Sequence, residues 1–365
     1  MPRGNEPQSR HQLVRMLGIG DGKCGKSDWA ARPIESGYNV LYMDADVGIQ
    51  TIQGLTRDPK NPVKPSAMQN IFTLPCHDTL VNGGMDFRFV NLFKRFTTQA
   101  TFRWNDTQSR EWSVMLDGDE TEDTVWEIRP AMLDHNCVLV LDSWTSLSQS
   151  CMNWASSELN IDLMEVSEEE RRQMRAVYQA AGEKLTQFLI MIRSLPCHVI
   201  VIAHPREFVK TEKKAGGSVS QAEKDMKVLW TKMMPASSSN NHAFMMAKYF
   251  TDLGWFEVDS MGDFMVDFRA DGSRLSGSHF NKRLNTRSEG RFVDLVNHIG
   301  GTVPTEAHTP FDHWLTIHQG FKAPDGKKPG LVLWAQKSAD GAPAQVTGIA
   351  PATKAQPIRL NLGPK

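Results

Sequence analysis

The chain has 365 residues, which is long enough for one large α/β domain with insertions or for two domains. Its 41 basic and 42 acidic residues leave a formal net charge of −1, which excludes a global basic field for nucleic acid, so any such contact must come from a local patch. The five cysteines have no metal-ligand spacing, and residues 1–10 are polar and indicate a flexible N-terminus. No apolar stretch approaches the roughly 18 residues of a membrane span. We therefore expect a soluble intracellular protein without a membrane partner.

The first predicted element is a strand over residues 13–17 that leads into a phosphate-binding motif. The motif follows the pattern G-x-x-x-x-G-K-[ST] and consists of Gly20, Asp21, Gly22, Lys23, Cys24, Gly25, Lys26 and Ser27. The glycines let successive backbone N–H groups point at phosphate oxygens, Lys26 reaches the β- and γ-phosphates, and the Ser27 hydroxyl ligates Mg²⁺. A helix over residues 28–36 should follow, ended or kinked early by Pro33. The motif predicts binding of a nucleoside triphosphate, and the alternative is a glycine-rich turn without a ligand.

Three further apolar runs predict buried parallel strands over residues 39–43, 137–141 and 198–202, because they are nearly continuous in Val, Leu and Ile. Polar residues follow these runs directly: Asp44 and Asp46, then Asp142 and Ser143, then His204. Ligands of open α/β sheets bind at the carboxyl ends of strands, so we expect these polar ends to converge on the phosphate loop. Asp142 has the place of a carboxylate that holds Mg²⁺, although a strand that ends in a helix-capping Asp has the same appearance.

Other segments define the organisation of the chain, with an expected core over residues 11–305. Residues 97–128 alternate aromatic and polar side chains and predict a β-rich insertion, whose tryptophans either pack on the core or stack on bases. Helical spacing predicts a long helix over residues 167–195, opened by a capping-box pattern. Residues 205–241 are polar and glycine-containing and are expected to be mobile, and strands are expected over residues 255–258 and 264–268. Residues 306–365 form a C-terminal extension, expected to be loosely ordered from about residue 322.

The order of these motifs resembles the RecA-like P-loop ATPase core over residues 12–294. The residues that carry the resemblance are the phosphate loop, the Asp-Ala-Asp of residues 44–46, the Leu-Asp-Ser-Trp-Thr-Ser-Leu of residues 141–147 and the Val-Ile-Ala-His of residues 201–204. The chain is most similar to bacteriophage RecA-type recombinases and single-strand annealing ATPases of the AAA-type ATPase domain family. The resemblance implies an α/β fold with a mainly parallel central sheet flanked by helices, ATP and Mg²⁺ as ligands, and a homo-oligomeric ring or filament.

The resemblance also implies catalytic roles for Asp46, Lys26 and His204. Asp46 matches a carboxylate, usually Glu, that polarises the attacking water, and His204 matches the polar residue that senses the γ-phosphate. Because Asp is one methylene shorter than Glu, hydrolysis is expected to be slow or to use Asp44 instead. From the residues alone, the alternatives are that Asp46 caps a helix or turn and that His204 is a structural histidine.

In RecA-like proteins the loop after the sensor strand faces single-stranded DNA, which places candidate DNA contacts on residues 205–241. These contacts are Arg206, Lys210, Lys213, Lys214, Lys224 and Lys227. The second DNA loop of the family is expected near residues 149–172, where this chain is acidic. Arg269 and Arg274 are candidates for the cation that a neighbouring subunit inserts against the γ-phosphate.

We therefore expect an ATP-hydrolysing protein that acts on single-stranded DNA in phage recombination, annealing or replication. It would work in the cytoplasm, that of the host if a phage encodes it, with a single-strand binding protein as a further partner. The alternatives are a hexameric replicative helicase on the same core, a nucleotide-dependent scaffold with little turnover, and a small-molecule kinase.

Overall fold

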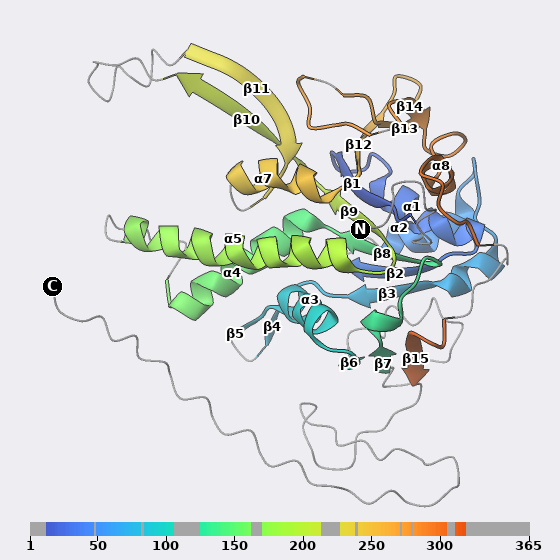
Figure 1. Ribbon diagram of the computed structural model, residues 1–365, viewed down its shortest axis with the longest axis horizontal. Helices are drawn as coiled ribbons and strands as arrows, with labels where there is room; N and C mark the ends of the chain where they lie inside the picture. The colour runs from blue at the N-terminus through green and yellow to red at the C-terminus, as the bar shows by residue number, and fades with distance from the viewer. Residues whose placement is uncertain are drawn as a thin grey trace, which may run out of the picture. The chain divides into compact units, whose positions relative to one another are not determined.

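The computed structural model describes residues 12–46, 49–81, 84–105, 125–161, 170–212, 227–237, 240–270, 272–278, 280–304 and 311–318. All of them belong to one compact unit, Met1–Phe321, whereas the second unit, Lys322–Lys365, lies outside the described residues. The predictions for residues 1–10 and for the tail from residue 322 therefore also lie outside them. Within the described residues, the largest element is an eight-stranded sheet in the order β14-β13-β12-β1-β9-β8-β2-β3 (Figure 1).

This sheet is mainly parallel, as predicted. Its parallel strands are β1 (Arg15–Gly20), β2 (Asn39–Asp44), β3 (Ile71–Pro75), β8 (Cys137–Asp142), β9 (His198–Ala203) and β12 (Asp252–Val258). Two antiparallel strands, β13 (Phe264–Asp267) and β14 (Arg283–Asn285), complete one edge. The four strands predicted from apolar runs correspond to β1, β2, β8 and β9. Their runs are continuous because both faces of the sheet are covered.

Two apolar cores lie on opposite faces of the sheet, because successive side chains of a strand point to opposite sides. Leu17 of β1 belongs to the core beneath α3 (Arg88–Thr98), α4 (Trp144–Leu159) and α5 (Glu170–Ser194). Met16 belongs to the other core, which α1 (Lys26–Ala31), α2 (Ile49–Gly54) and α8 (Phe292–His298) cover. Figure 1 shows these two groups of helices on either side of the strands.

The predicted helices need small revisions. The helix predicted over residues 28–36 is α1 followed by a 3-10 turn, Arg32–Ser36, with Pro33 at its start, so the expected early end at Pro33 is confirmed. The long helix predicted over residues 167–195 is α5, and its capping box begins outside the described residues. The loop that the resemblance implied near residues 149–172 is wrong for its first part, because α4 continues to Leu159 and ends only at Asn160, which has a left-handed φ of 55°.

The described parts of residues 205–241 form strands and a helix, which differs from the mobile loop that their polar composition predicted. Strands β10 (Pro205–Glu212) and β11 (Lys227–Pro235) pair as an antiparallel hairpin, and α7 (Asn240–Met246) follows. Figure 1 shows the hairpin running outward from the sheet above α7, and the Phe208 ring meets Phe244 of α7 edge-on, with 5.3 Å between centroids. Composition averaged over the segment concealed strand-forming residues such as Phe208 and Val209. Residues 213–226 lie outside the described part.

The predicted β-rich insertion is confirmed as a hairpin of β6 (Phe102–Asn105) and β7 (Val125–Ile128). Residues 97 and 98 instead end α3, and a separate small hairpin, β4 (Thr79–Val81) with β5 (Gly84–Asp86), precedes that helix. Trp104 and Trp126 oppose each other and are both buried, which favours packing over base stacking, whereas Trp112 lies outside the described residues.

The prediction of a separate C-terminal extension from residue 306 onward is wrong for residues 311–318, which pack on the core. Strand β15 (Leu315–His318) adds to β7 as the third strand of the insertion sheet. Trp314 is fully buried, and its ring meets Phe72 of β3 edge-on, with 5.5 Å between centroids. The core therefore includes a segment that the sequence assigned to the tail.

Replacing Trp314 by alanine should lower the free energy of unfolding by about 3–5 kcal/mol, because the change leaves a large cavity beside Phe72. Urea denaturation followed by circular dichroism measures the change. Met132→Ala serves as the control, since this side chain is 51% exposed and its loss should change stability by under about 0.5 kcal/mol. A loss below about 1 kcal/mol for Trp314→Ala would contradict the assignment of this segment to the core.

All five cysteines are buried free thiols. In the part of the chain that the structure describes, no helix combines the length and apolar character needed to cross a bilayer.

Candidate functional site

The phosphate loop joins β1 to α1 at the carboxyl edge of the sheet, and two of its glycines are required by close packing. Gly25 caps α1 with a φ of +84°, and a Cβ at this position would lie 2.8 Å from the ring of Phe264. At Gly20 a Cβ would lie 2.5 Å from the carbonyl oxygen of Phe256. Close packing against β12 and β13 therefore leaves no room for a side chain at either glycine.

Lys26 is buried inside this loop. Its ammonium donates hydrogen bonds to the carbonyl oxygens of Gly20, at 2.8 Å, and of Asp21. The Cys24 thiol also donates to the Asp21 carbonyl, at 3.0 Å, and burial raises the pKa of this thiol despite the nearby Lys26. The loop thus holds a positive charge at the place where the sequence motif expects phosphates.

Ser27 and Asp142, the two residues that the sequence proposes as Mg²⁺ ligands, meet directly. The Ser27 hydroxyl donates to Asp142 Oδ2 at 2.7 Å, and the Tyr42 hydroxyl donates to the same oxygen. Burial raises the pKa of Asp142, although both hydrogen bonds oppose this shift, and burial followed by the charge of Asp142 raises the pKa of Tyr42 well above its usual value. A hydroxyl and a carboxylate are the oxygen donors that Mg²⁺ prefers, so the residues present fit this ion.

Asp46 and His204 form a second pair at the same edge. His204 Nε2 lies 3.4 Å from Asp46 Oδ2, and the Ser146 hydroxyl donates to Asp46 Oδ1. Burial alone would raise the pKa of Asp46, but the hydrogen bonds from His204 and Ser146 outweigh it and lower the pKa. Asp46 is therefore an ionised carboxylate at neutral pH, held by groups from two other elements.

The sheet order explains why these residues meet. Strands β1, β9, β8 and β2 are consecutive neighbours, so their carboxyl ends carry the phosphate loop, His204, Asp142 and Asp46 side by side. The backbone N–H of Ala45 also donates to the Asp142 carbonyl at 2.7 Å. The predicted convergence of the four strand ends is confirmed.

Sequence reasoning missed Tyr42, Thr145 and Ser146. A hydroxyl in the middle of the apolar run 39–43 was a usable signal, because a buried tyrosine usually needs a hydrogen-bond partner. Thr145 and Ser146 belong to the motif of residues 141–147, but their residue types gave no sign of a role in the site, since hydroxyl residues are common in a first helical turn.

The backbone of His204 is attached on both sides. Its N–H donates to Thr145 Oγ1 of α4 at 2.9 Å. Its carbonyl accepts from the N–H of Ala236 at 2.7 Å, directly after β11. His204 therefore contacts Asp46, just after β2, through its side chain. Through its backbone it contacts α4 and the base of the β10–β11 hairpin.

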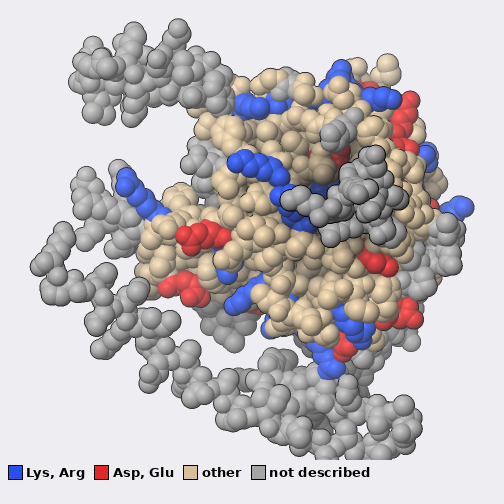
Figure 2. Space-filling model, in the orientation of Figure 1, with Lys and Arg blue, Asp and Glu red and all other residues tan. Residues whose placement is uncertain are grey.

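Only some of the predicted DNA contacts lie among the residues that the structure describes. Arg206 is exposed on β10 and lines a cavity of about 390 Å³, together with Gln149 of α4, Tyr178 of α5 and Ser237 after β11. Lys210 lies in β10 and Lys227 begins β11, whereas Lys213, Lys214 and Lys224 lie outside the described residues. Figure 2 shows basic and acidic side chains interspersed on the face drawn there, in agreement with the net charge of −1.

Arg269 and Arg274 make ion pairs within their own chain. Arg269 pairs with Asp267 at 2.7 Å, and Arg274 pairs with Glu257 at 3.2 Å and lies over the Trp255 ring. Asp267 pairs with Trp255 of β12, and Trp255 in turn pairs with Ile19, the last residue before the phosphate loop. The action of the two arginines on a neighbouring subunit therefore stays a hypothesis.

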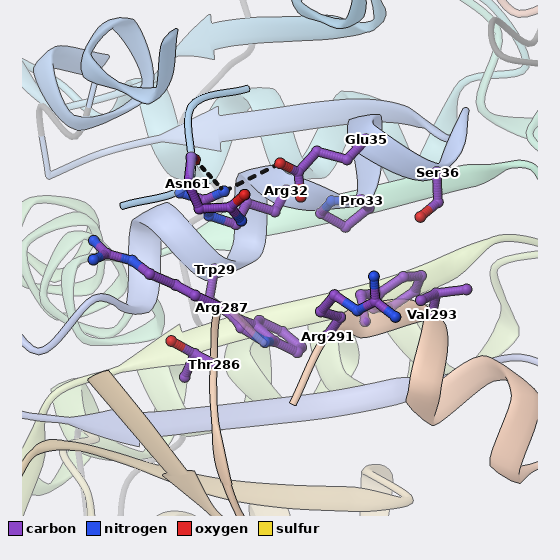
Figure 3. Close-up of a pocket in the computed structure, with 11 residues that line it drawn as sticks. Trp29, Arg32, Pro33, Glu35, Ser36, Asn61, Thr286, Arg287, Arg291 and Val293 are labelled. Carbon is purple, nitrogen blue, oxygen red and sulfur yellow. Dashed lines mark hydrogen bonds and ion pairs between the residues drawn. The ribbon is translucent and has the colours of Figure 1, made fainter. Parts of the chain in front are cut away.

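A second cavity, of about 240 Å³, lies at the far end of α1. Figure 3 shows Arg32, Glu35 and Asn61 along one wall and Thr286, Arg287 and Arg291 along the other. Each arginine already pairs with a carboxylate: Arg32 with Asp28, Glu35 and Asp58, Arg287 with Asp58, and Arg291 with Asp294. We assign these ion pairs to the packing of α1 and do not include the cavity in the site.

A family model described as AAA domain matches residues 13–234, which is more than half of the chain and includes the phosphate loop, Asp46, Asp142 and His204. The chain belongs to this AAA domain family. Such AAA domains are generally P-loop ATPases, so membership implies nucleotide binding, typically with Mg²⁺. A search of curated proteins found no match.

Proposed function

We propose that this AAA domain is a RecA-like ATPase that transmits the state of its nucleotide to a hairpin in contact with single-stranded DNA. The observation that carries the proposal is the attachment of His204. Its side chain faces Asp46 at 3.4 Å, while its carbonyl holds the base of the β10–β11 hairpin through Ala236. His204, the residue proposed to meet the γ-phosphate, is thus hydrogen-bonded to the base of the hairpin.

In the proposed site each residue has one role. Lys26 and the loop bind the phosphates, and Ser27 and Asp142 hold Mg²⁺, which neutralises phosphate charge when bound. The Asp46 carboxylate accepts the proton of the attacking water, and His204 senses the γ-phosphate. Asp142 lies deeper than Asp46 and shares one oxygen with two hydroxyl donors, which favours Asp46 over Asp142 as the base.

The coupling follows from the same bonds. In this proposal, a γ-phosphate draws the His204 side chain away from Asp46, and an accompanying shift of the His204 backbone would pass through its hydrogen bonds to Thr145 and Ala236. Hairpin position would then differ between the ATP and ADP states, as in other switches that respond to a γ-phosphate.

The cavity at the base of the hairpin supplies the chemistry for the DNA. Arg206 offers a cation for backbone phosphate, and Tyr178, which is 45% exposed, offers a ring on which a base can stack. Such contacts bind single strands with little sequence preference, which suits recombination, annealing or replication. A homo-oligomer, with Arg269 or Arg274 reaching a neighbouring site, belongs to the same proposal.

Single-stranded DNA should stimulate ATP hydrolysis by the wild-type protein several-fold. In Arg206→Ala, DNA affinity should fall about three- to tenfold and the salt dependence of binding should weaken, because one phosphate contact is lost. Basal hydrolysis without DNA should not change. Phosphate release with and without an oligonucleotide, combined with fluorescence anisotropy at several salt concentrations, measures both effects.

Arg193→Ala is the matched control, because it removes an exposed arginine from the other end of α5. It should bind DNA like the wild type. Absence of both stimulation and DNA binding in the wild type would contradict the DNA part of the proposal and favour a scaffold or a kinase. Strand separation of a forked duplex would favour the helicase.

A further inference from the structure

The carboxylate of Asp46 is held from α4 as well as from His204. Ser146, in the first turn of α4, donates its hydroxyl to Asp46 Oδ1, while His204 faces Oδ2. The Asp46 side chain is about a quarter exposed, 26%, so packing alone does not fix its rotamer. These two polar contacts, together with a hydrogen bond from Ser143, therefore orient the carboxylate.

The hydroxyl of Ser146 is itself oriented. Ser143, the N-cap of α4, accepts a hydrogen bond from the backbone N–H of Ser146 at 3.2 Å, and the two hydroxyl oxygens also lie 3.2 Å apart. A hydroxyl has a single proton to donate, and Ser146 gives its proton to Asp46. The Ser143 side chain also hydrogen-bonds the Asp46 carboxylate, so the start of α4 holds Asp46 through two hydroxyl groups, those of Ser143 and Ser146.

Thr145, the residue next to Ser146, holds the other member of the pair. Its Oγ1 accepts from the backbone N–H of His204 at 2.9 Å. Two successive residues of one helical turn thus fix both Asp46 and His204. An aspartate has less reach than a glutamate, and the rate of proton transfer depends on placement within fractions of an ångström.

We propose that Ser146 is a positioning residue for ATP hydrolysis, whose hydroxyl aims the Asp46 carboxylate at the attacking water. In that step the water gives a proton to Asp46, and its oxygen bonds to the γ-phosphorus. The bond from this phosphorus to the bridging oxygen breaks, and ADP and phosphate leave. The inference rests on the proposed ATPase function and adds a residue that belongs to neither the phosphate loop nor the metal pair.

Ser146→Ala should lower kcat about ten- to hundredfold, as expected for a misplaced base. KM and the Kd for a fluorescent ATP analogue should stay within about twofold, because Ser146 has no contact with the phosphate loop among its described hydrogen bonds. Ser146→Thr keeps the hydroxyl and should restore kcat to within about threefold of the wild type.

Ser150→Ala is the matched control. Ser150 lies one turn further along α4 and donates to another carboxylate, Asp78 Oδ1, at 2.9 Å, so its loss breaks the same kind of bond outside the site. It should leave kcat unchanged. An unchanged kcat in Ser146→Ala, an equal loss in Ser150→Ala, or failure of threonine to rescue would each overturn the role of Ser146. Absence of hydrolysis in the wild type would instead overturn the proposed function itself.

Discussion

Lys26→Ala is expected to lower the affinity for ATP about a hundredfold or more and to reduce hydrolysis to background. The ammonium is the buried positive charge of the phosphate loop, hydrogen-bonded to the carbonyls of Gly20 and Asp21. Each hydrogen bond to a charged group contributes about 1.5–3 kcal/mol, and about 1.4 kcal/mol corresponds to a tenfold change in Kd. Titration with a fluorescent ATP analogue and a phosphate-release assay measure the two effects.

A thermal shift separates lost binding from lost folding. Mg²⁺ with ATP should raise the Tm of the wild type, because a ligand that binds only the folded state stabilises it, and should not raise that of Lys26→Ala. Lys94→Ala, which removes an exposed lysine from α3, should respond like the wild type. Wild-type affinity in Lys26→Ala would mean that this loop does not bind the nucleotide.

Asp46→Asn is expected to lower kcat about 10²- to 10⁴-fold while ATP binds within about threefold of normal, as general-base catalysis typically contributes this much. The amide keeps the shape of the side chain and can still accept a hydrogen bond from Ser146, but it cannot take a proton from water. Steady-state phosphate release gives kcat, and equilibrium binding of the analogue gives the affinity.

Asp78→Asn is the control for this change. Asp78 follows the neighbouring strand β3 and is held by Ser150, in the way that Ser146 holds Asp46, yet it has no proposed role in hydrolysis. Its variant should keep the wild-type kcat. In the Asp46→Asn background, Ser146→Ala should have little further effect on kcat, because residues that act as one unit are not additive. Near-normal turnover in Asp46→Asn would assign the water-activating role to another group, such as Asp44.

The sequence predicted the sheet and the phosphate loop because both have local signals. Buried parallel strands such as β8 and β9 are continuous apolar runs, and the loop pairs required glycines with Lys26 and Ser27 at fixed spacing. Even the early end of α1 was readable, because Pro33 cannot continue a helix.

The errors share a different cause. Residues 205–212 and 227–235 form strands because each pairs with the other, and that pairing is invisible in an average over a polar segment. Trp314 is part of the core because Phe72 lies beside it, although the two are far apart in the chain. The loop expected near residue 149 is a helix because α4 packs against α5 and the sheet.

By itself the sequence determined which residues are candidates for the site: a phosphate loop, two carboxylates and a histidine, each just after an apolar run. Spacing along the chain was enough for this, because those residues stand at the ends of strands whose patterns are local. Only the tertiary structure decided which residues meet, pairing Ser27 with Asp142, Asp46 with His204 and Ser146, and His204 with the base of a hairpin. The physical reason is that such contacts depend on strand order and helix placement, which packing between distant segments determines.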